Sequence, residues 1–332
     1  MISHRRAAAF VLVLAAVSFG STARGETNAA TRATSASETP FEILIDWQAE
    51  PTYLGVYYAK SLGLYKKLGL AVSVVQGRGA NQAVAAVAAG TYKIATASGG
   101  ATVLGLNAGM HLVSLGVLYP NISTVVYGLA TSKIAEPKDL VGRKIGIYPG
   151  SITKNEFDAF VKLTHLDPKS FDVISITGPD IPLLKAGQLD AVLHYSEMSP
   201  VVVSLDPEVQ AVNGRRVFEL PLAKYGVTTY GLNIVTSRDA YTREPSRLKQ
   251  IASAIFDGYQ LGCKNIDAAV AAFHADFPQS GADYIRESWT KVCATIGDNF
   301  GQQTSAGWQA TIDTYKSLGL LTVEAQPKDV MP

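Results

Sequence analysis

Small and polar residues gather in five short loops, each directly after an apolar segment of the β-strand type. In an open parallel sheet, such loops lie beyond the carboxyl ends of the strands, where ligands bind. Three of them lead straight into a predicted helix, whose first backbone N–H groups are free to donate to a ligand. Each loop alone is ordinary turn chemistry, but together they predict one binding site. The loops are residues 46–47, 77–79, 98–100, 149–151 and 194–197.

Side chains in and near these loops suit a flat ligand with several hydrogen-bonding groups. Trp47 follows a core strand, so its ring is expected to project into the site; a core position under the first helix is the alternative. Glu197 is expected to accept hydrogen bonds from ligand N–H groups, or else to be an exposed carboxylate at a helix start. Tyrosines would supply aromatic walls with polar tips, and small residues would supply hydroxyl and N–H donors. The other predicted contacts are Tyr53, Ser98, Gly99, Tyr148, Gly150, Ser151, Tyr195 and Tyr230.

The segments that carry these loops alternate between strand and helix patterns. Short runs rich in β-branched residues are followed by longer runs with apolar residues at helical spacing. The predicted strands are residues 41–45, 71–75, 93–97, 112–118, 144–148, 171–176, 191–193, 215–219 and 228–235. The predicted helices are residues 53–68, 81–89, 101–108, 153–164, 248–261, 266–273, 284–296 and 306–318. This alternation favours an α/β protein with largely parallel, doubly wound sheets and a helical tail.

The N-terminus has the pattern of an export signal. Arg5 and Arg6 precede an apolar run of thirteen residues, 7–19, and residues 23–25 offer small side chains for cleavage. These features are typical of a secretory signal peptide, here residues 1–25. The run is shorter than the roughly 20 residues that span a membrane, which argues against the alternative of an uncleaved anchor. The polar residues 26–40 show no apolar period and are predicted to form a disordered leader.

Composition and motifs exclude several classes of function. The 29 Lys and Arg residues nearly balance the 28 Asp and Glu residues, so no basic field for nucleic acid is expected. The sequence contains neither the GxxxxGK[ST] loop of an ATPase nor the GxSxG elbow of an α/β hydrolase. No cofactor or metal is expected, because Cys263 and Cys293 have no His/Cys cluster beside them. One disulfide between them and two separate buried thiols are equally compatible with the sequence.

Several segments resemble the NMT1/THI5-like periplasmic binding proteins, a group within the type II binding-protein superfamily. That family includes binders of thiamine pyrimidine precursors and is related to binders of alkanesulfonates, nitrate and taurine. The resemblance covers roughly residues 41–320. The matching segments are residues 46–47, 55–59, 63–70, 88–90, 94–97, 137–146 and 187–191.

The resemblance implies a two-lobed type II periplasmic-binding-protein fold with mixed, mostly parallel sheets. The first lobe would comprise residues 41–130 and 232–332, and the second lobe residues 131–231. Two crossing segments, around residues 127–131 and 228–237, would form a hinge that lets the lobes close on a ligand. The protein would be a periplasmic monomer and not an enzyme. It would deliver its ligand to an ABC permease and its ATPase subunit, with no membrane insertion of the mature chain.

The implied ligand is a small planar nitrogen-containing molecule, such as a pyrimidine or thiamine precursor. Two departures bear on this: Tyr53 stands where pyrimidine binders tend to carry His, and Ile152 replaces a second small polar residue in the loop that anion-binding relatives use. Three alternatives remain, namely a binder of an alkanesulfonate, nitrate or other small anion, a pyrimidine-precursor synthase-like enzyme, and a periplasmic sensor. For an anion, Arg78 is the obvious cationic candidate.

Overall fold

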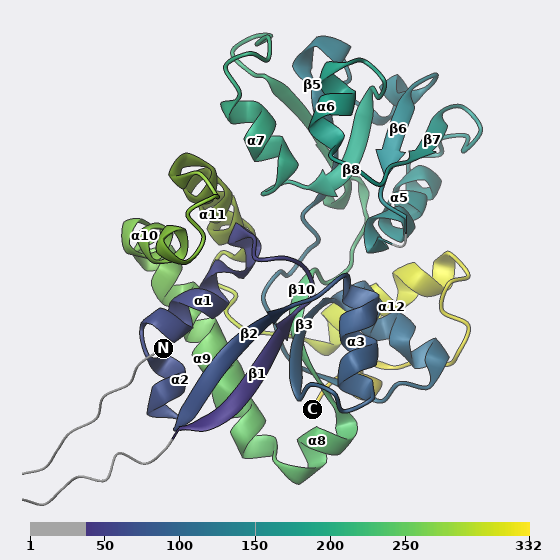
Figure 1. The fold of residues 1–332 in the computed structure, drawn as a ribbon. Coiled ribbons are helices and arrows are strands. Elements are labelled where there is room, and N and C mark those ends of the chain that lie inside the picture. Colours follow the sequence, from purple (N-terminus) through teal and green to yellow (C-terminus); the bar gives the residue numbers. More distant parts are fainter. Residues whose placement is uncertain (1–37, 150) are drawn as a thin grey trace, which may run out of the picture. The chain divides into compact units, whose positions relative to one another are not determined.

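The computed structural model describes residues 38–149 and 151–332, which build two five-stranded sheets (Figure 1). The strand order in the first sheet is β2-β1-β3-β10-β4. Its strands are β1 Thr39–Ile45, β2 Leu70–Gln76, β3 Ile94–Ser98, β4 Leu112–Val117 and β10 Leu232–Ser237. β1 runs parallel to β2 and β3, whereas β10 is antiparallel to both of its neighbours, β3 and β4. We call this sheet and the helices packed on it the first lobe.

The second sheet repeats this plan and forms the second lobe with its own helices. Its strand order is β7-β6-β8-β5-β9. The strands are β5 Thr124–Leu129, β6 Lys144–Ile147, β7 Asp172–Ser175, β8 Ala191–Tyr195 and β9 Val217–Pro221. Here β5 is the strand that runs against its neighbours, β8 and β9, while β6 is parallel to β7 and β8. The predicted α/β class with mixed, mostly parallel sheets is therefore confirmed.

Helices cover both sheets, and the predicted helical tail packs on the first (Figure 1). In the first lobe, α1 and α9 bury a large apolar cluster together with α10 and α11. The first-lobe helices are α1 Leu54–Ser61, α2 Leu64–Lys67, α3 Ala80–Ala88, α4 Gly99–Leu104, α8 Arg238–Arg243, α9 Pro245–Lys264, α10 Ile266–Asp276, α11 Ala282–Ile296 and α12 Ser305–Ser317. The second-lobe helices are α5 Ile152–Leu163, α6 Asp180–Lys185 and α7 Ser199–Leu205.

The chain passes between the sheets twice, but one crossing lies earlier than expected. Residues 118–123 connect β4 to β5, and residues 226–231 lead from the second sheet back to β10. The expected segment at 127–131 instead begins inside β5, which pairs with β8 and β9. Assigning residues up to 130 to the first lobe was therefore wrong for β5. An apolar strand of this kind fits either sheet, so its pattern alone does not reveal its partners.

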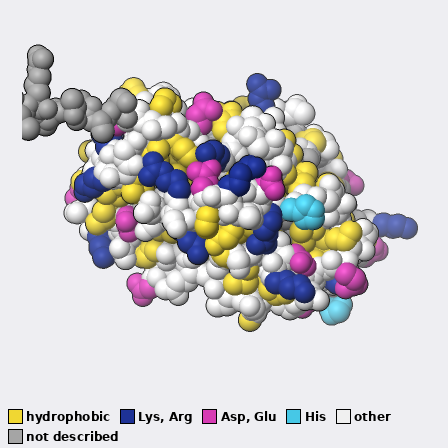
Figure 2. Space-filling model, turned by 90° about the horizontal axis from the view of Figure 1, so that it is seen from below, with side chains coloured by type: hydrophobic (Ala, Val, Ile, Leu, Met, Phe, Trp, Pro, Cys, Tyr) yellow, Lys and Arg dark blue, Asp and Glu magenta, His cyan; other side chains and the backbone are white. Residues whose placement is uncertain are grey.

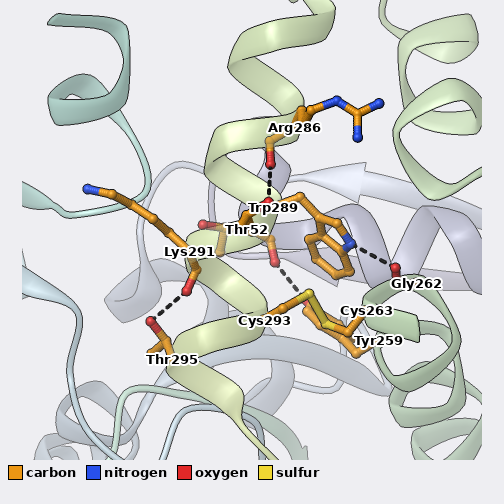
Figure 3. The surroundings of a disulfide bond; sticks show 10 residues. Thr52, Tyr259, Gly262, Cys263, Arg286, Trp289, Lys291, Cys293 and Thr295 are labelled. Atoms are coloured by element: carbon orange, nitrogen blue, oxygen red, sulfur yellow. Dashed lines mark hydrogen bonds between the residues drawn. A yellow bond between two sulfur atoms is a disulfide. The ribbon is translucent and has the colours of Figure 1, made fainter. Parts of the chain in front are cut away.

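A disulfide joins Cys263, at the end of α9, to Cys293 on α11, so the disulfide alternative is confirmed (Figure 3). The Cα atoms are 5.5 Å apart. Beside it, the Trp289 indole N–H donates to the Gly262 carbonyl at 3.1 Å. The Tyr259 hydroxyl donates to the Thr52 carbonyl at 2.7 Å, which fixes the 3₁₀ helix η1, Pro51–Tyr53, against α9.

The surface and the termini add little that is specific. On the face shown in Figure 2, basic and acidic side chains are interspersed with neutral and apolar ones. Within the part of the chain that the structure describes, no helix has the length and apolar character needed to cross a membrane. The predicted signal peptide and most of the predicted leader, residues 26–37, lie outside the described residues.

Candidate ligand-binding cavity

A cavity of about 700 Å³ is lined by residues from both lobes. Its walls include the loops after β1, β3, β6 and β8, which are the strand ends where the sequence places a site. Side chains before α11 and in the first crossing segment complete it. The predicted contacts that line the cavity are Trp47, Tyr53, Ser98, Tyr148, Ser151, Tyr195 and Glu197.

Two of the remaining predicted contacts, Tyr230 and Gly99, do not line this cavity. Tyr230 is buried with its ring against Trp308, with ring centres 5.1 Å apart, and its hydroxyl accepts from the Thr304 N–H at 2.9 Å. Gly99 packs against the same segment, and a Cβ there would stand 2.5 Å from the Tyr230 carbonyl oxygen. Both residues hold the second crossing segment in place. Gly150 lies outside the described residues.

Ser98 and Ser151 reach the cavity as helix caps. The Ser98 hydroxyl accepts from the Ala101 N–H at 3.1 Å at the start of α4. The Ser151 hydroxyl accepts from the Thr153 N–H at 3.3 Å at the start of α5. Each cap therefore satisfies one free N–H of its helix and sets where the loop turns into the helix. Because these hydroxyls already accept, they remain suited to donating towards a ligand.

Asp46 and Tyr53 form a polar pair in the first-lobe wall. The Tyr53 hydroxyl donates to Asp46 Oδ1 at 2.9 Å, and the Thr96 hydroxyl donates to the same oxygen. The backbone N–H of Asp46 donates in turn to Thr96 Oγ1 at 2.8 Å. Burial raises the pKa of Asp46 and outweighs these hydrogen bonds, which lower it. Tyr53 is thus locked in orientation by a carboxylate that the sequence analysis did not single out.

Glu197 is a buried carboxylate, 2% exposed, so the alternative of an exposed helix-start carboxylate is wrong. Its Oε1 accepts from the Thr52 and Ser123 hydroxyls, each at 3.1 Å. Thr52 belongs to the first lobe and Ser123 to the first crossing segment, so this side chain joins the two lobes across the cavity. Its Oε2 is buried without a hydrogen-bond partner among the described residues. Burial raises the pKa of this carboxyl.

Glu156 lies in the second-lobe wall, on α5, and is also 2% exposed. Thr124 of β5 donates a hydrogen bond to its Oε2. Burial raises the pKa of Glu156 to about 7. Glu156 is not among the predicted contacts, although the sequence carries a signal for it. Glu156 falls among Ile152, Phe157 and Phe160 on the buried face of α5, where a charged residue needs an explanation.

The outer part of the cavity is more open. Trp47 is 43% exposed there, so it is neither a core residue nor fully enclosed. Glu50 accepts from the Tyr284 hydroxyl at 2.8 Å, and burial raises its pKa. Arg78 is exposed, and it is the one Lys or Arg side chain in the described part of the wall.

Aromatic groups form much of the second-lobe wall. The Tyr148 and His194 rings meet edge to face with centres 5.8 Å apart, and burial lowers the pKa of His194. His194 Nδ1 accepts from the Tyr195 N–H at 2.9 Å. The wall therefore offers π surfaces, hydroxyls and carboxylates, which suit a flat ligand rich in N–H groups. Among residues 38–149 and 151–332, no three His, Cys, Asp or Glu side chains are grouped to hold a metal ion.

Comparisons with known proteins identify relatives of two kinds. A 4-amino-5-hydroxymethyl-2-methylpyrimidine phosphate synthase from Legionella pneumophila is 25% identical over 134 residues, which is 40% of this chain and 42% of that protein. The formylaminopyrimidine-binding protein of Halalkalibacterium halodurans is 23% identical over 82% of this chain and 83% of its own length. The chain thus spans less than half of the first relative and most of the second.

Among solved structures, the alkanesulfonate-binding protein SsuA from Xanthomonas axonopodis pv. citri superposes with a TM-score of 0.68. It is 16% identical, over 89% of this chain and 99% of that one, which demonstrates a shared periplasmic-binding-protein fold. Residues 50–269 match the family model described as NMT1/THI5 like. Since this match covers well over half of the sequence, the chain belongs to the NMT1/THI5-like family.

Proposed function

We propose that the protein is the substrate-binding component of an ABC importer, capturing a small planar nitrogen-containing molecule between its lobes. The observation that carries the proposal is the cavity of about 700 Å³, in which buried acceptors face aromatic walls from both sheets. This volume falls within the range of small-molecule sites. The name of the relative from Halalkalibacterium halodurans, a formylaminopyrimidine-binding protein, supports a ligand of pyrimidine size and polarity.

Capture would proceed by closure of the lobes about residues 118–123 and 226–231. Both crossings are single short stretches between a strand of one sheet and an element of the other, which suits hinge bending. Thr52 and Glu197 come from opposite lobes and are already hydrogen-bonded at the cavity, so closure would bring the rest of the walls together around this contact. The closed form would dock on a membrane permease whose ATPase subunit supplies the energy.

A periplasmic monomer fits this role. The Cys263–Cys293 disulfide is compatible with an oxidising compartment, where such bonds persist. Export would depend on the pattern in residues 1–25. A synthase activity is the second candidate, because the relative from Legionella pneumophila bears that name.

A thermal-shift panel of pyrimidines, flavins, alkanesulfonates and nitrate tests the proposal. A ligand that binds only the folded protein stabilises it as its concentration exceeds Kd, so a true ligand raises Tm in a concentration-dependent way. We expect a pyrimidine or related heterocycle to do so and to be recovered chemically unchanged by mass spectrometry. Stabilisation by sulfonates alone would overturn the planar-ligand proposal, and recovery of a converted product would replace binding by catalysis.

A further inference from the structure

We infer that the ligand carries a formal positive charge, as a protonated amine or amidine attached to its planar part. The inference rests on the proposed binding function and names its ligand class more narrowly. The charge would lie next to Tyr195, among Asp46, Glu156 and Glu197. A neutral heterocycle or an anion would not use this part of the cavity.

The ionisable groups in the wall are mostly acidic. Its carboxylates are Asp46, Glu50, Glu156 and Glu197, and Arg78 is the one Lys or Arg in the described wall. His194 does not offset them, because burial lowers its pKa. Lys291 lies outside the wall; its charge lowers the pKa of Glu197, but its Nζ is bonded elsewhere, 2.6 Å from Glu219 Oε1 and 3.0 Å from the Ser196 carbonyl oxygen.

Three of these acidic side chains, Asp46, Glu156 and Glu197, share the cavity wall with Tyr195. Tyr195 ends β8 and lines the cavity. Its pKa is raised well above the usual value, first by burial and then by the charges of Glu156, Asp46 and Glu197. These residues come from α5, from the end of β1 and from the loop after β8. Because all four residues line one cavity, a cation bound beside Tyr195 would have acidic groups from both lobes around it.

Glu197 provides an independent indication of a missing donor. Its Oε1 already has two donors, whereas the buried Oε2 has none among the described residues. The Tyr119 hydroxyl, which also lacks a partner there, lies close enough to Glu197 to interact with it. A buried carboxylate is costly unless it is paired and hydrogen-bonded. The planar amidinium group presents parallel N–H donors and a delocalised charge, which match a carboxylate in the manner of an arginine side chain. Such a ligand group would supply both the donor and the charge.

The experiment uses three probes of one shape and different charge: benzamidine, benzamide and benzoate. Calorimetric titration of the purified protein at pH 7.5 should give a Kd for benzamidine at least about tenfold lower than for benzamide. Benzoate should bind more weakly than either. Glu197→Gln and Glu156→Gln should each raise the Kd of benzamidine by about tenfold or more while changing benzamide much less, because only the cation loses a charge partner.

Glu42→Gln is the matched control, since Glu42 is an exposed carboxylate on β1, the strand that leads into Asp46, and lies outside the cavity wall. It should leave the benzamidine titration unchanged. Circular dichroism checks that each variant is folded. If Glu156→Gln or Glu197→Gln fails to fold, the corresponding Asp variant takes its place. The Asp variants retain the negative charge, so they should still bind benzamidine more tightly than benzamide.

Benzamide or benzoate binding as tightly as benzamidine would overturn the inference. Binding of a neutral heterocycle from the thermal-shift panel with no response to benzamidine would overturn it as well, and the binding function would stand. Failure of every panel compound and every probe would overturn both.

Discussion

Glu156 is the residue whose environment most constrains its chemistry. It is buried on α5, receives one hydrogen bond from Thr124, and has Tyr195 and Tyr315 near enough to feel its charge. The sequence pattern of α5 places it on the apolar face, but the pattern cannot say that the face borders a cavity. The sequence predicts contacts at Trp47, Tyr195 and Glu197 because these residues directly follow predicted strands. In an open parallel sheet, ligands bind beyond the carboxyl ends of the strands. Glu156 follows no strand and was missed.

The free energy of unfolding should depend on the pH through Glu156. The folded carboxyl keeps its proton up to about pH 7, against an ordinary pKa of 4.5. Between these values the unfolded chain releases the proton first, so rising pH favours unfolding by about 3 kcal/mol in total from this group. Urea unfolding should be measured at pH 4.5 and at pH 8 for both proteins. Between these pH values, the free energy of unfolding of wild type should fall by about 3 kcal/mol more than that of Glu156→Gln. Identical pH dependence in the two proteins would contradict the raised pKa of this buried carboxyl.

At the scale of elements, order along the chain was predictable and pairing was not. The alternation of strand and helix patterns predicted every described strand except β5, together with the helical tail and the loops that carry the site. The membership of β5 in the second sheet depends on contacts with β8 and β9, which are distant in sequence. Gly99 and Tyr230 sit at a predicted loop and strand, yet they pack on each other rather than line the cavity. The direction in which a side chain at a crossing segment points depends on the elements packed around it, so the local sequence pattern does not predict it.

Gly99→Ala should destabilise the protein by about 1–3 kcal/mol, because the new Cβ would meet the Tyr230 carbonyl oxygen, which belongs to the backbone and has little freedom to move. Gly178→Ala is the control, since no atom lies within 4 Å of its Cβ position. Chemical denaturation measures both. Equal stability of the two variants would show that the crossing segment yields to the methyl group.

The Cys263–Cys293 bond should stabilise α9 and α11 together. It closes a loop with a sequence separation of 30 residues. Loss of that constraint in the Cys263→Ala, Cys293→Ala double variant should lower the free energy of unfolding by about 3–4 kcal/mol. Reductant should destabilise wild type and leave the double variant unaffected. A reductant effect on both would point to a cause other than this bond.

For the whole molecule, the central question is how far the lobes move. Thr52 and Glu197 meet across the cavity, and Lys291 on α11 reaches Glu219 on β9, so polar contacts already link the lobes on one side. In Figure 3, Lys291 extends away from the disulfide on the same helix. Adding the compound with the largest thermal shift should lower the radius of gyration measured by solution X-ray scattering. Glu197→Gln should need more compound for the same change, and a radius that stays constant at saturation would argue against hinge closure.

The placement of the tryptophans makes the protein its own optical reporter. Trp289 and Trp308 are fully buried, whereas Trp47 is 43% exposed at the mouth of the cavity. Emission at the red edge of the fluorescence spectrum should therefore come from one indole, the one that a bound molecule would cover. A ligand titration could be followed, without a label, by the blue shift or quenching of the Trp47 emission. The Trp47→Phe variant, which lacks this indole, would be the control and should show no such change.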